Sequence, residues 1–83
     1  MYVICVQWGN LTHSSSYAPT NRTVTLPLTI STLYSCVTTT MGIEYQACNA
    51  SYYSHTTTAI VFRDGGVNNA SEITGFYWLA IAK

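Results

Sequence analysis

Few residues of this 83-residue chain could carry out acid–base, nucleophilic or metal chemistry. The carboxylates are Glu44, Asp64 and Glu72, and the imidazoles are His13 and His55. A glycosidase needs two carboxylates across one bond, but Asp64 belongs to an Asp-Gly-Gly turn signal and Glu72 to a polar connection. Neither histidine has a second His or a Cys at metal-ligand spacing, and no G-x-S-x-G or P-loop motif is present. The sequence predicts a non-enzyme without metal or cofactor.

The cysteines Cys5, Cys36 and Cys48 form an odd set without close spacing. A disulfide framework normally uses an even number, and free Cys is among the most buried residue types. Three buried free thiols are therefore the favoured interpretation. One disulfide with a spare thiol, or a Cys/His metal site, remains an alternative.

The remaining polar and aromatic side chains could form a recognition surface. The candidate cluster in and beside one expected loop is Tyr45, Asn49, Tyr52, Tyr53 and His55. Tyrosine offers an apolar face to a sugar ring and a hydroxyl to its edge, and asparagine supplies both a donor and an acceptor. The pattern is typical of carbohydrate or mixed-epitope binding, although these tyrosines could instead pack on the scaffold or across a subunit interface. Weaker candidates of the same kind are His13, Tyr17, Asn68 and Asn69.

Composition places these residues on a β scaffold. Hydrophobic residues make up 48% of the chain and charged residues 7%, and most of the rest are Ser, Thr and Asn, which together with Val, Ile and Tyr suit strands. Three basic side chains cannot neutralise a phosphate backbone, so nucleic acid is not expected as a partner. No apolar stretch is long enough to span a membrane, so membrane insertion is not expected.

The alternation of apolar residues and the turn signals predict an all-β domain over residues 1–83. Strands are expected at residues 2–8, 22–30, 33–40, 43–47, 56–63 and 76–82. Loops are expected at residues 11–21, 49–54 and 67–74, with turns at Gly9-Asn10 and Asp64-Gly65-Gly66. Five to seven short strands indicate a small antiparallel β-sandwich or barrel.

The last expected strand is apolar on both faces, so both faces need a cover. A chain of this size buries only a modest core, and one subunit is not expected to cover both. The predicted core consists of Val3, Cys5, Trp8, Val24, Leu26, Val37, Ile60, Phe62, Trp78, Leu79 and Ile81.

Three segments resemble a C-terminal tip domain of bacteriophage tail fibres. Residues 3–9 (VICVQWG) are similar to the family's I-I-Q-W-G opening. Residues 24–28 (VTLPL), followed by residues 34–37 (YSCV), are similar to its V-T-F-P strand and the next strand. Residues 76–81 (FYWLAI) match its closing F-Y-W-I-A-I-G, with Ala82 in place of the usual glycine. The order agrees over essentially the whole chain, but the middle has no counterpart, so no binding residue carries over.

The resemblance implies a homotrimeric β-structured knob at the distal tip of a virion tail fibre, as a fragment of a longer fibre protein. Its loops would bind a host receptor: lipopolysaccharide, another glycan or an outer-membrane protein. Synthesis in the reducing cytoplasm of the bacterial host would agree with unpaired cysteines. One alternative is a domain that trimerises and caps the fibre without receptor contact. Another is a small secreted lectin-like domain, in which Asn10 or Asn49 would carry glycans.

Overall fold

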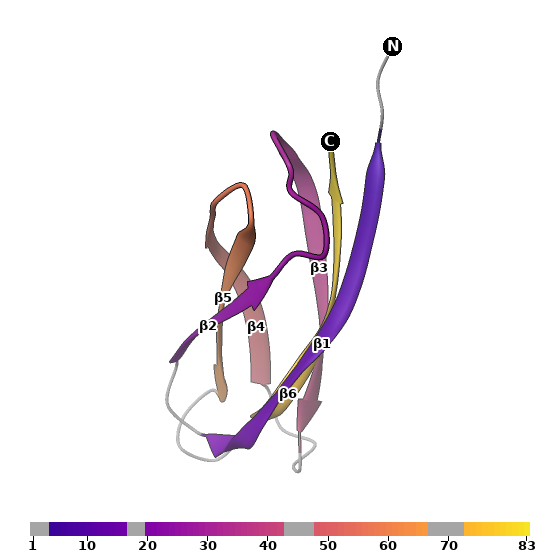
Figure 1. Ribbon diagram of the computed structural model, residues 1–83. Helices are drawn as coiled ribbons and strands as arrows, with labels where there is room; N and C mark the ends of the chain where they lie inside the picture. The colour runs from indigo at the N-terminus through magenta and orange to yellow at the C-terminus, as the bar shows by residue number, and fades with distance from the viewer. Residues whose placement is uncertain (1–3, 17–19, 43–47, 67–72) are drawn as a thin grey trace.

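The computed structural model describes residues 4–16, 20–42, 48–66 and 73–83, and these form six strands. The strands are β1 (Cys5–Ser16), β2 (Thr20–Thr25), β3 (Leu33–Gly42), β4 (Cys48–His55), β5 (Ala59–Gly66) and β6 (Ile73–Ala82). They pair antiparallel in two three-stranded sheets, ordered β1-β6-β3 and β2-β5-β4 (Figure 1). The predicted antiparallel all-β fold is confirmed, and it is a sandwich.

The C-terminal strand β6 is the centre of its sheet, between β1 and β3. Its Leu79 lies opposite Trp8 of β1 and Val37 of β3, so three side chains form one row across the outer face. The neighbouring residues of β6 alternate to the inner face, where they are buried. This central position explains why the strand is apolar on both faces.

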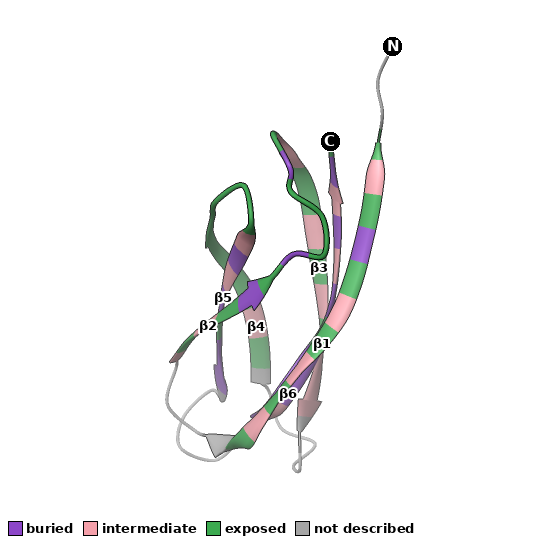
Figure 2. Cartoon of the chain, in the orientation of Figure 1, coloured by how far each residue is buried: buried purple, intermediate pink, exposed green. Residues whose placement is uncertain are grey.

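The core lies between the two sheets, and Figure 2 shows buried residues on β1, β2, β5 and β6. Phe62 of β5 and Phe76 of β6 meet edge to face, with ring centroids 5.1 Å apart, a favoured aromatic geometry. The core cluster comprises Val24, Leu26, Ile30, Ile60, Phe62, Phe76, Trp78, Ala80 and Ala82. The predictions for Val24, Leu26, Ile60, Phe62 and Trp78 are confirmed.

The expectation that Trp8 and Val37 belong to the core is wrong, because their side chains are 70% and 59% exposed. Successive residues of a strand point to opposite faces, and here the neighbours Gln7 and Cys36 occupy the inward positions. Leu79 and Ile81 share the outer face and are only half-buried, while Cys5 packs against the core edge. Val3 lies outside the described residues.

Several predicted boundaries are also wrong. Residues 11–16 continue β1 and residues 20–21 begin β2, where a loop was expected. Residues 49–54 form most of β4, and residues 64–66 continue β5 rather than turning, since these two segments pair with each other. Long-range pairing outweighs the turn preference of Asp and Gly. The second strand ends at Thr25, before Pro27, which cannot donate to a ladder. The strand expected at residues 43–47 lies outside the described residues.

Two glycines are required by close contacts between β1 and β6. Gly75 has φ +147°, and a Cβ there would lie 2.0 Å from the Leu11 carbonyl oxygen. Gly9 lies opposite Trp78, whose indole ring would be 3.0 Å from an added Cβ. The Gln-Trp-Gly segment of the sequence therefore pairs with residues 78–80, and Gly75 meets the backbone of residues 11–12.

Gln7 attaches the connection between β2 and β3 to the edge of the sandwich. Its side chain is buried. The Leu28 backbone N–H donates to Gln7 Oε1 at 2.9 Å, and Gln7 Nε2 donates to the Leu28 carbonyl at 3.1 Å. One amide side chain thus satisfies both backbone groups of a residue that is outside the strands.

Candidate functional site

The predicted binding residues divide into those that the structure describes and those that it does not. Tyr17, Tyr45, Asn68 and Asn69 lie outside the described residues. The others fall on strands: Asn49, Tyr52, Tyr53 and His55 on β4 and His13 on β1. The described candidates are therefore presented by the scaffold itself.

Strand β4 is an edge strand that pairs with β5, and its described side chains are exposed except for half-buried Ala50. The Tyr52 hydroxyl lies 2.7 Å from His55 Nδ1, and the two rings lie 5.8 Å apart. Tyr53 is 58% exposed. Near the middle of the strand, Thr38 of β3 donates a 2.6 Å hydrogen bond to the Ala50 carbonyl, which joins the two sheets at this edge.

Bulges determine which side chains face one another across this edge. In β4 the register shifts between Tyr52 and Ser54, so Tyr53 is the extra residue. Without a bulge, residues three apart point to opposite faces of a strand. The bulge places Tyr52 and His55 on one face, opposite the core residues Phe62 and Ile60 of β5.

Strand β3 contains a similar bulge. Its register shifts between Leu33 and Ser35, which makes Tyr34 the extra residue. Leu33 and Cys36, again three residues apart, consequently share the face that lies opposite Ala82 and Ala80. Both side chains are half-buried against the core.

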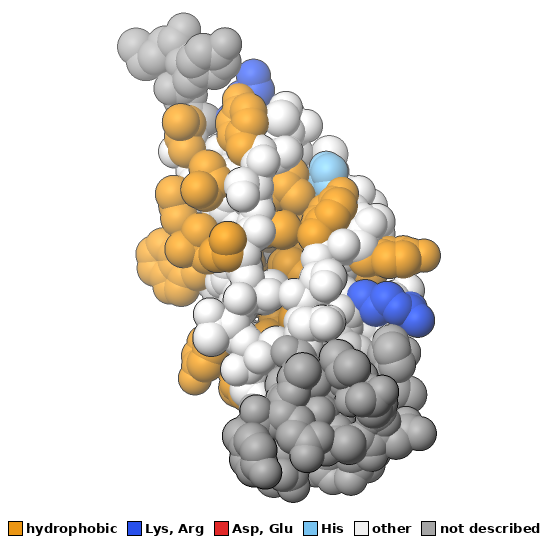
Figure 3. Space-filling model, turned by 180° about the vertical axis from the view of Figure 1, so that it is seen from behind, with side chains coloured by type: hydrophobic (Ala, Val, Ile, Leu, Met, Phe, Trp, Pro, Cys, Tyr) orange, Lys and Arg blue, Asp and Glu red, His pale blue; other side chains and the backbone are white. Residues whose placement is uncertain are grey.

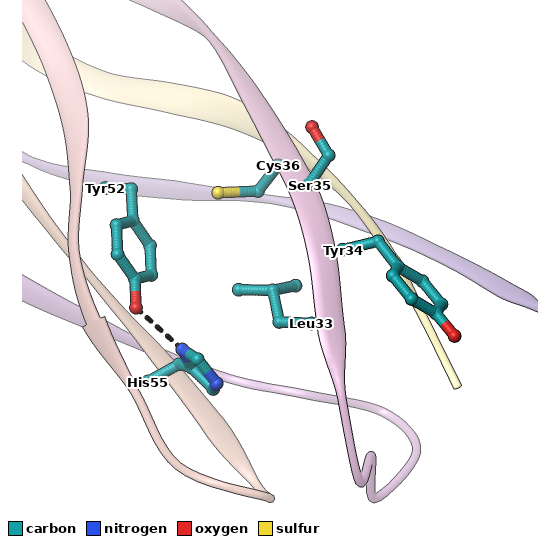
Figure 4. A pocket seen from close by; sticks show the side chains of 6 residues that line it. All are labelled: Leu33, Tyr34, Ser35, Cys36, Tyr52 and His55. Atoms are coloured by element: carbon teal, nitrogen blue, oxygen red, sulfur yellow. Dashed lines mark hydrogen bonds between the residues drawn. The ribbon is translucent and has the colours of Figure 1, made fainter.

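The four side chains that the two bulges align border a groove of about 350 Å³ between β3 and β4. Figure 4 shows Leu33 and Cys36 on one side and Tyr52 with His55 on the other, while the Tyr34 ring points away. Burial raises the pKa of the Cys36 thiol above its ordinary value. At neutral pH this keeps the thiol uncharged, so the groove has an apolar floor.

A second, smaller hollow of about 200 Å³ adjoins the first at His55. Its lining adds hydroxyl groups from Ser31, Thr56 and Thr57 to the apolar side chain of Ile30. Among the residues that the structure describes, none that lines either hollow carries a carboxylate, an ammonium or a guanidinium group. The edge between the sheets therefore offers an uncharged surface of aromatic rings, hydroxyls and one imidazole.

His13 lies away from this edge, in an ion-pair network between the sheets. Its Nε2 is 2.7 Å from Asp64 Oδ2, and Arg22 Nε is 3.0 Å from Asp64 Oδ1. The Asp64 side chain is fully buried. The expectation of a turn role for Asp64 is therefore wrong; its parity with Ile60 and Phe62 along the strand was a signal that it points inward.

The outer face of the β1-β6-β3 sheet is apolar. Rows across the three strands place Val6 beside Ile81, and Trp8 beside Leu79 and Val37. The exposed members of this face, hereafter the apolar face, are Ile4, Val6, Trp8, Val37 and Tyr77, with half-buried Leu79 and Ile81 between them. Seen from behind, hydrophobic side chains gather along one flank of the molecule (Figure 3). An apolar surface of this kind marks an interaction site.

Other kinds of site find little support among the described residues. Cys5 and Cys36 are free thiols, and the Cys48 side chain lies outside the described part of the structure. Within the described ranges, no group of three or more His, Cys, Asp and Glu residues could hold a metal ion. The same part of the chain contains no helix of the length and apolar character needed to cross a bilayer.

Comparison with known proteins relates the fold to tail fibres. No protein-family model and no curated protein matches the chain. A structure of the C-terminal part of the P. aeruginosa R1 pyocin fibre superposes with a TM-score of 0.77 at 20% identity, covering 96% of this chain and 23% of that one. An N-truncated R1-type pyocin tail fibre gives the same TM-score and identity and is covered to 71%. The chain thus spans less than a quarter of the first structure, and its fold is one found within a tail fibre.

Proposed function

We propose that this chain is a non-enzymatic receptor-recognition domain at the distal end of a tail fibre in a phage or a fibre-bearing particle. The fold shared with two pyocin fibre structures supports this assignment, as does the resemblance of three ordered sequence segments to tail-fibre tips. In this proposal the domain is made in the bacterial cytoplasm and acts on the assembled particle.

The observation that carries the proposal is the separation of two different surfaces on opposite sheets. The apolar face lies on β1-β6-β3, and the polar-aromatic strand β4 lies at the edge of the other sheet. In a homotrimer, two further copies would cover the apolar face and leave β4 open to a receptor. Three linked receptor contacts would then gain avidity without any new chemistry.

The receptor is a glycan of the bacterial surface, such as lipopolysaccharide, or an outer-membrane protein. Uncharged polar groups and exposed tyrosines suit such a receptor, because tyrosine contributes contact area at a small entropic cost. Asn49, Tyr52, Tyr53 and His55 are the described residues assigned to this contact. Nucleic acid and inserted membrane are not proposed as partners.

Binding of the labelled protein to a panel of bacterial strains tests the proposal. A strain that binds the wild-type protein should bind the Tyr52→Ala/Tyr53→Ala variant much more weakly. The matched control is Thr23→Ala/Thr25→Ala, which alters two exposed residues on β2, at the far edge of the same sheet. Stripping lipopolysaccharide from the cells then separates a glycan receptor from a protein receptor. Absence of binding to every strain would contradict the proposed function.

A second candidate is a domain that only trimerises and caps the fibre. The apolar face favours it, since such a face can serve assembly alone. Unchanged binding of a fibre with Tyr52→Ala/Tyr53→Ala, together with an intact trimer, would favour this role over receptor recognition by β4.

A further inference from the structure

The paired bulges give the groove between β3 and β4 a specific architecture. Each bulge has a tyrosine as its extra residue. It brings the residue before the tyrosine and the second residue after it to the same face of the strand. Bulges that redirect side chains are over-represented beside functional sites, and they interrupt pairing at sheet edges. Two such bulges that face each other produce a groove whose walls come from different sheets.

We propose that this groove binds an uncharged segment of an oligosaccharide chain, with Tyr52 and His55 as the residues that hold it. The inference rests on the proposed receptor-recognition function and names the ligand class and the site. It also replaces the expected binding loop by a groove between two strands. Tyr52 and His55 line this groove, whereas their neighbours Asn49 and Tyr53 do not.

The lining explains the choice of ligand. A sugar ring has an apolar face and a rim of hydroxyl groups. The Tyr52 ring with the floor of Leu33 and Cys36 suits the apolar face. The Ser31, Thr56 and Thr57 hydroxyls of the adjoining hollow suit the rim. Charged groups on the ligand would find no counter-charge among the lining residues, so a neutral segment is favoured over a phosphorylated or uronic-acid segment.

The Tyr52–His55 pair orients the donor that meets the ligand. The Tyr52 hydroxyl and His55 Nδ1 form a hydrogen bond of 2.7 Å. In the tautomer in which the hydroxyl donates to Nδ1, the ring proton lies on Nε2. Among the described residues Nε2 has no hydrogen-bond partner. It can therefore donate to a sugar hydroxyl where the two hollows meet, since His55 lines both of them.

The dimensions favour a chain rather than a single buried ring. The larger hollow has about 350 Å³, at the lower end of the range of small-ligand sites. Tyr52 and His55 are exposed, so the groove is open to solvent and a chain can lie across it without a free end. The smaller hollow extends it past His55.

The test uses the purified chain with an array of neutral and acidic bacterial-surface oligosaccharides, followed by calorimetric titration of the best neutral binder. Tyr52→Ala and His55→Ala should each lower the affinity per site about tenfold. Tyr52→Phe should lose less affinity than Tyr52→Ala, because it removes the hydroxyl but keeps the ring. Ser51→Ala is the matched control, since it truncates another exposed side chain of the same strand that does not line the groove, and its affinity should stay within about twofold.

Chemical protection of Cys36 gives an independent readout. Cys36 lines the groove and Cys5 does not, so the bound oligosaccharide should slow alkylation of Cys36 and leave that of Cys5 unchanged in peptide mapping by mass spectrometry. Unfolding midpoints and oligomeric mass of all variants should match the wild type, because the substituted side chains are exposed.

The possible results separate this site from the broader function. Cell binding that survives Tyr52→Ala and His55→Ala, or is lost in Ser51→Ala, overturns the groove and leaves receptor recognition intact. Selection of acidic over neutral oligosaccharides, or binding to cells without any binding to the array, overturns the ligand class. Absence of binding to both cells and array overturns the proposed function together with the groove.

Discussion

At the scale of single residues, Asp64 connects strands from both sheets through its two carboxylate oxygens. Oδ2 contacts His13 of β1, and Oδ1 accepts from Arg22 of β2. The other His13 nitrogen, Nδ1, lies 2.6 Å from the Ser14 carbonyl oxygen and 3.4 Å from Arg22 Nη2. Asp64 thus shares its buried carboxylate between the imidazole of His13 and the guanidinium of Arg22.

Replacement of Asp64 by asparagine should destabilise the sandwich by about 3 kcal/mol or more, because it leaves the Arg22 guanidinium without its buried counter-charge. Urea unfolding should show a lower midpoint with an unchanged slope. The control Arg63→Gln removes an exposed hydrogen bond to Asn21 and should cost less than about 1 kcal/mol. A midpoint for Asp64→Asn equal to the wild type would show that the network contributes no net stability.

Gly75→Ala should be among the most damaging substitutions that add only a methyl group. The backbone at φ +147° disfavours any Cβ, and the added atom would meet the main chain of Leu11 at 2.0 Å. Gly9→Ala is the comparison, since its Cβ would meet the Trp78 ring at 3.0 Å, a contact that a small shift relieves. Thermal unfolding should rank wild type above Gly9→Ala and Gly9→Ala above Gly75→Ala; the reverse order would contradict the role of β1–β6 backbone contact.

At the scale of elements, Gln7 joins β1 to the connection that follows β2. Gln7→Leu should cost about 1–3 kcal/mol, because the N–H and C=O of Leu28 lose their protein partners. Hydrogen exchange of the Leu28 amide should accelerate more than that of amides in β6. Asn10→Ala, on the exposed face of the same strand, should change neither rate. An unchanged Leu28 exchange rate in Gln7→Leu would contradict the role of Gln7 in holding this connection.

The sequence predicted these elements unevenly, and the reasons are physical. Apolar alternation identified β2, and apolar or β-branched runs bounded by turn signals identified β3, β5 and β6. Strand β4 was read as a loop, since it is an edge strand with almost no buried residue to generate a pattern. Its strand character comes from pairing with β5, which no local preference encodes.

The sequence identified only half of the candidate site, for the same reason. Tyr52 and His55 stood out by type, but Leu33 and Cys36 did not, because they meet the pair across two sheets. The bulges that align all four depend on register with β5 and β6. Residue chemistry therefore indicated a recognition surface, while its shape and its partners required the fold.

At the scale of the whole molecule, the two sheets differ in what they leave uncovered. The β2-β5-β4 sheet exposes hydroxyls and tyrosines along β4. The β1-β6-β3 sheet exposes Trp8, Val37 and Tyr77 around half-buried Leu79. The apolar outer row of the central strand is the feature that a single copy of the chain leaves in water, and covering it recovers about 25 cal/mol for each Å² of apolar surface.

The purified protein should therefore have three times the monomer mass in light scattering at micromolar concentration, with the apolar face of each copy covered by the others. Trp8→Ser/Val37→Thr removes two strongly exposed hydrophobic side chains from the central row of that face and should shift the mass to that of a monomer. Because both residues point away from the core, the far-ultraviolet spectrum should keep its β character. The matched control Tyr53→Ser removes an exposed aromatic from the other sheet and should remain a trimer. A wild-type monomer, or a trimer in the Trp8→Ser/Val37→Thr variant, would contradict assembly through this face. A trimer in the variant would indicate that the interface lies at β4 and the groove beside it.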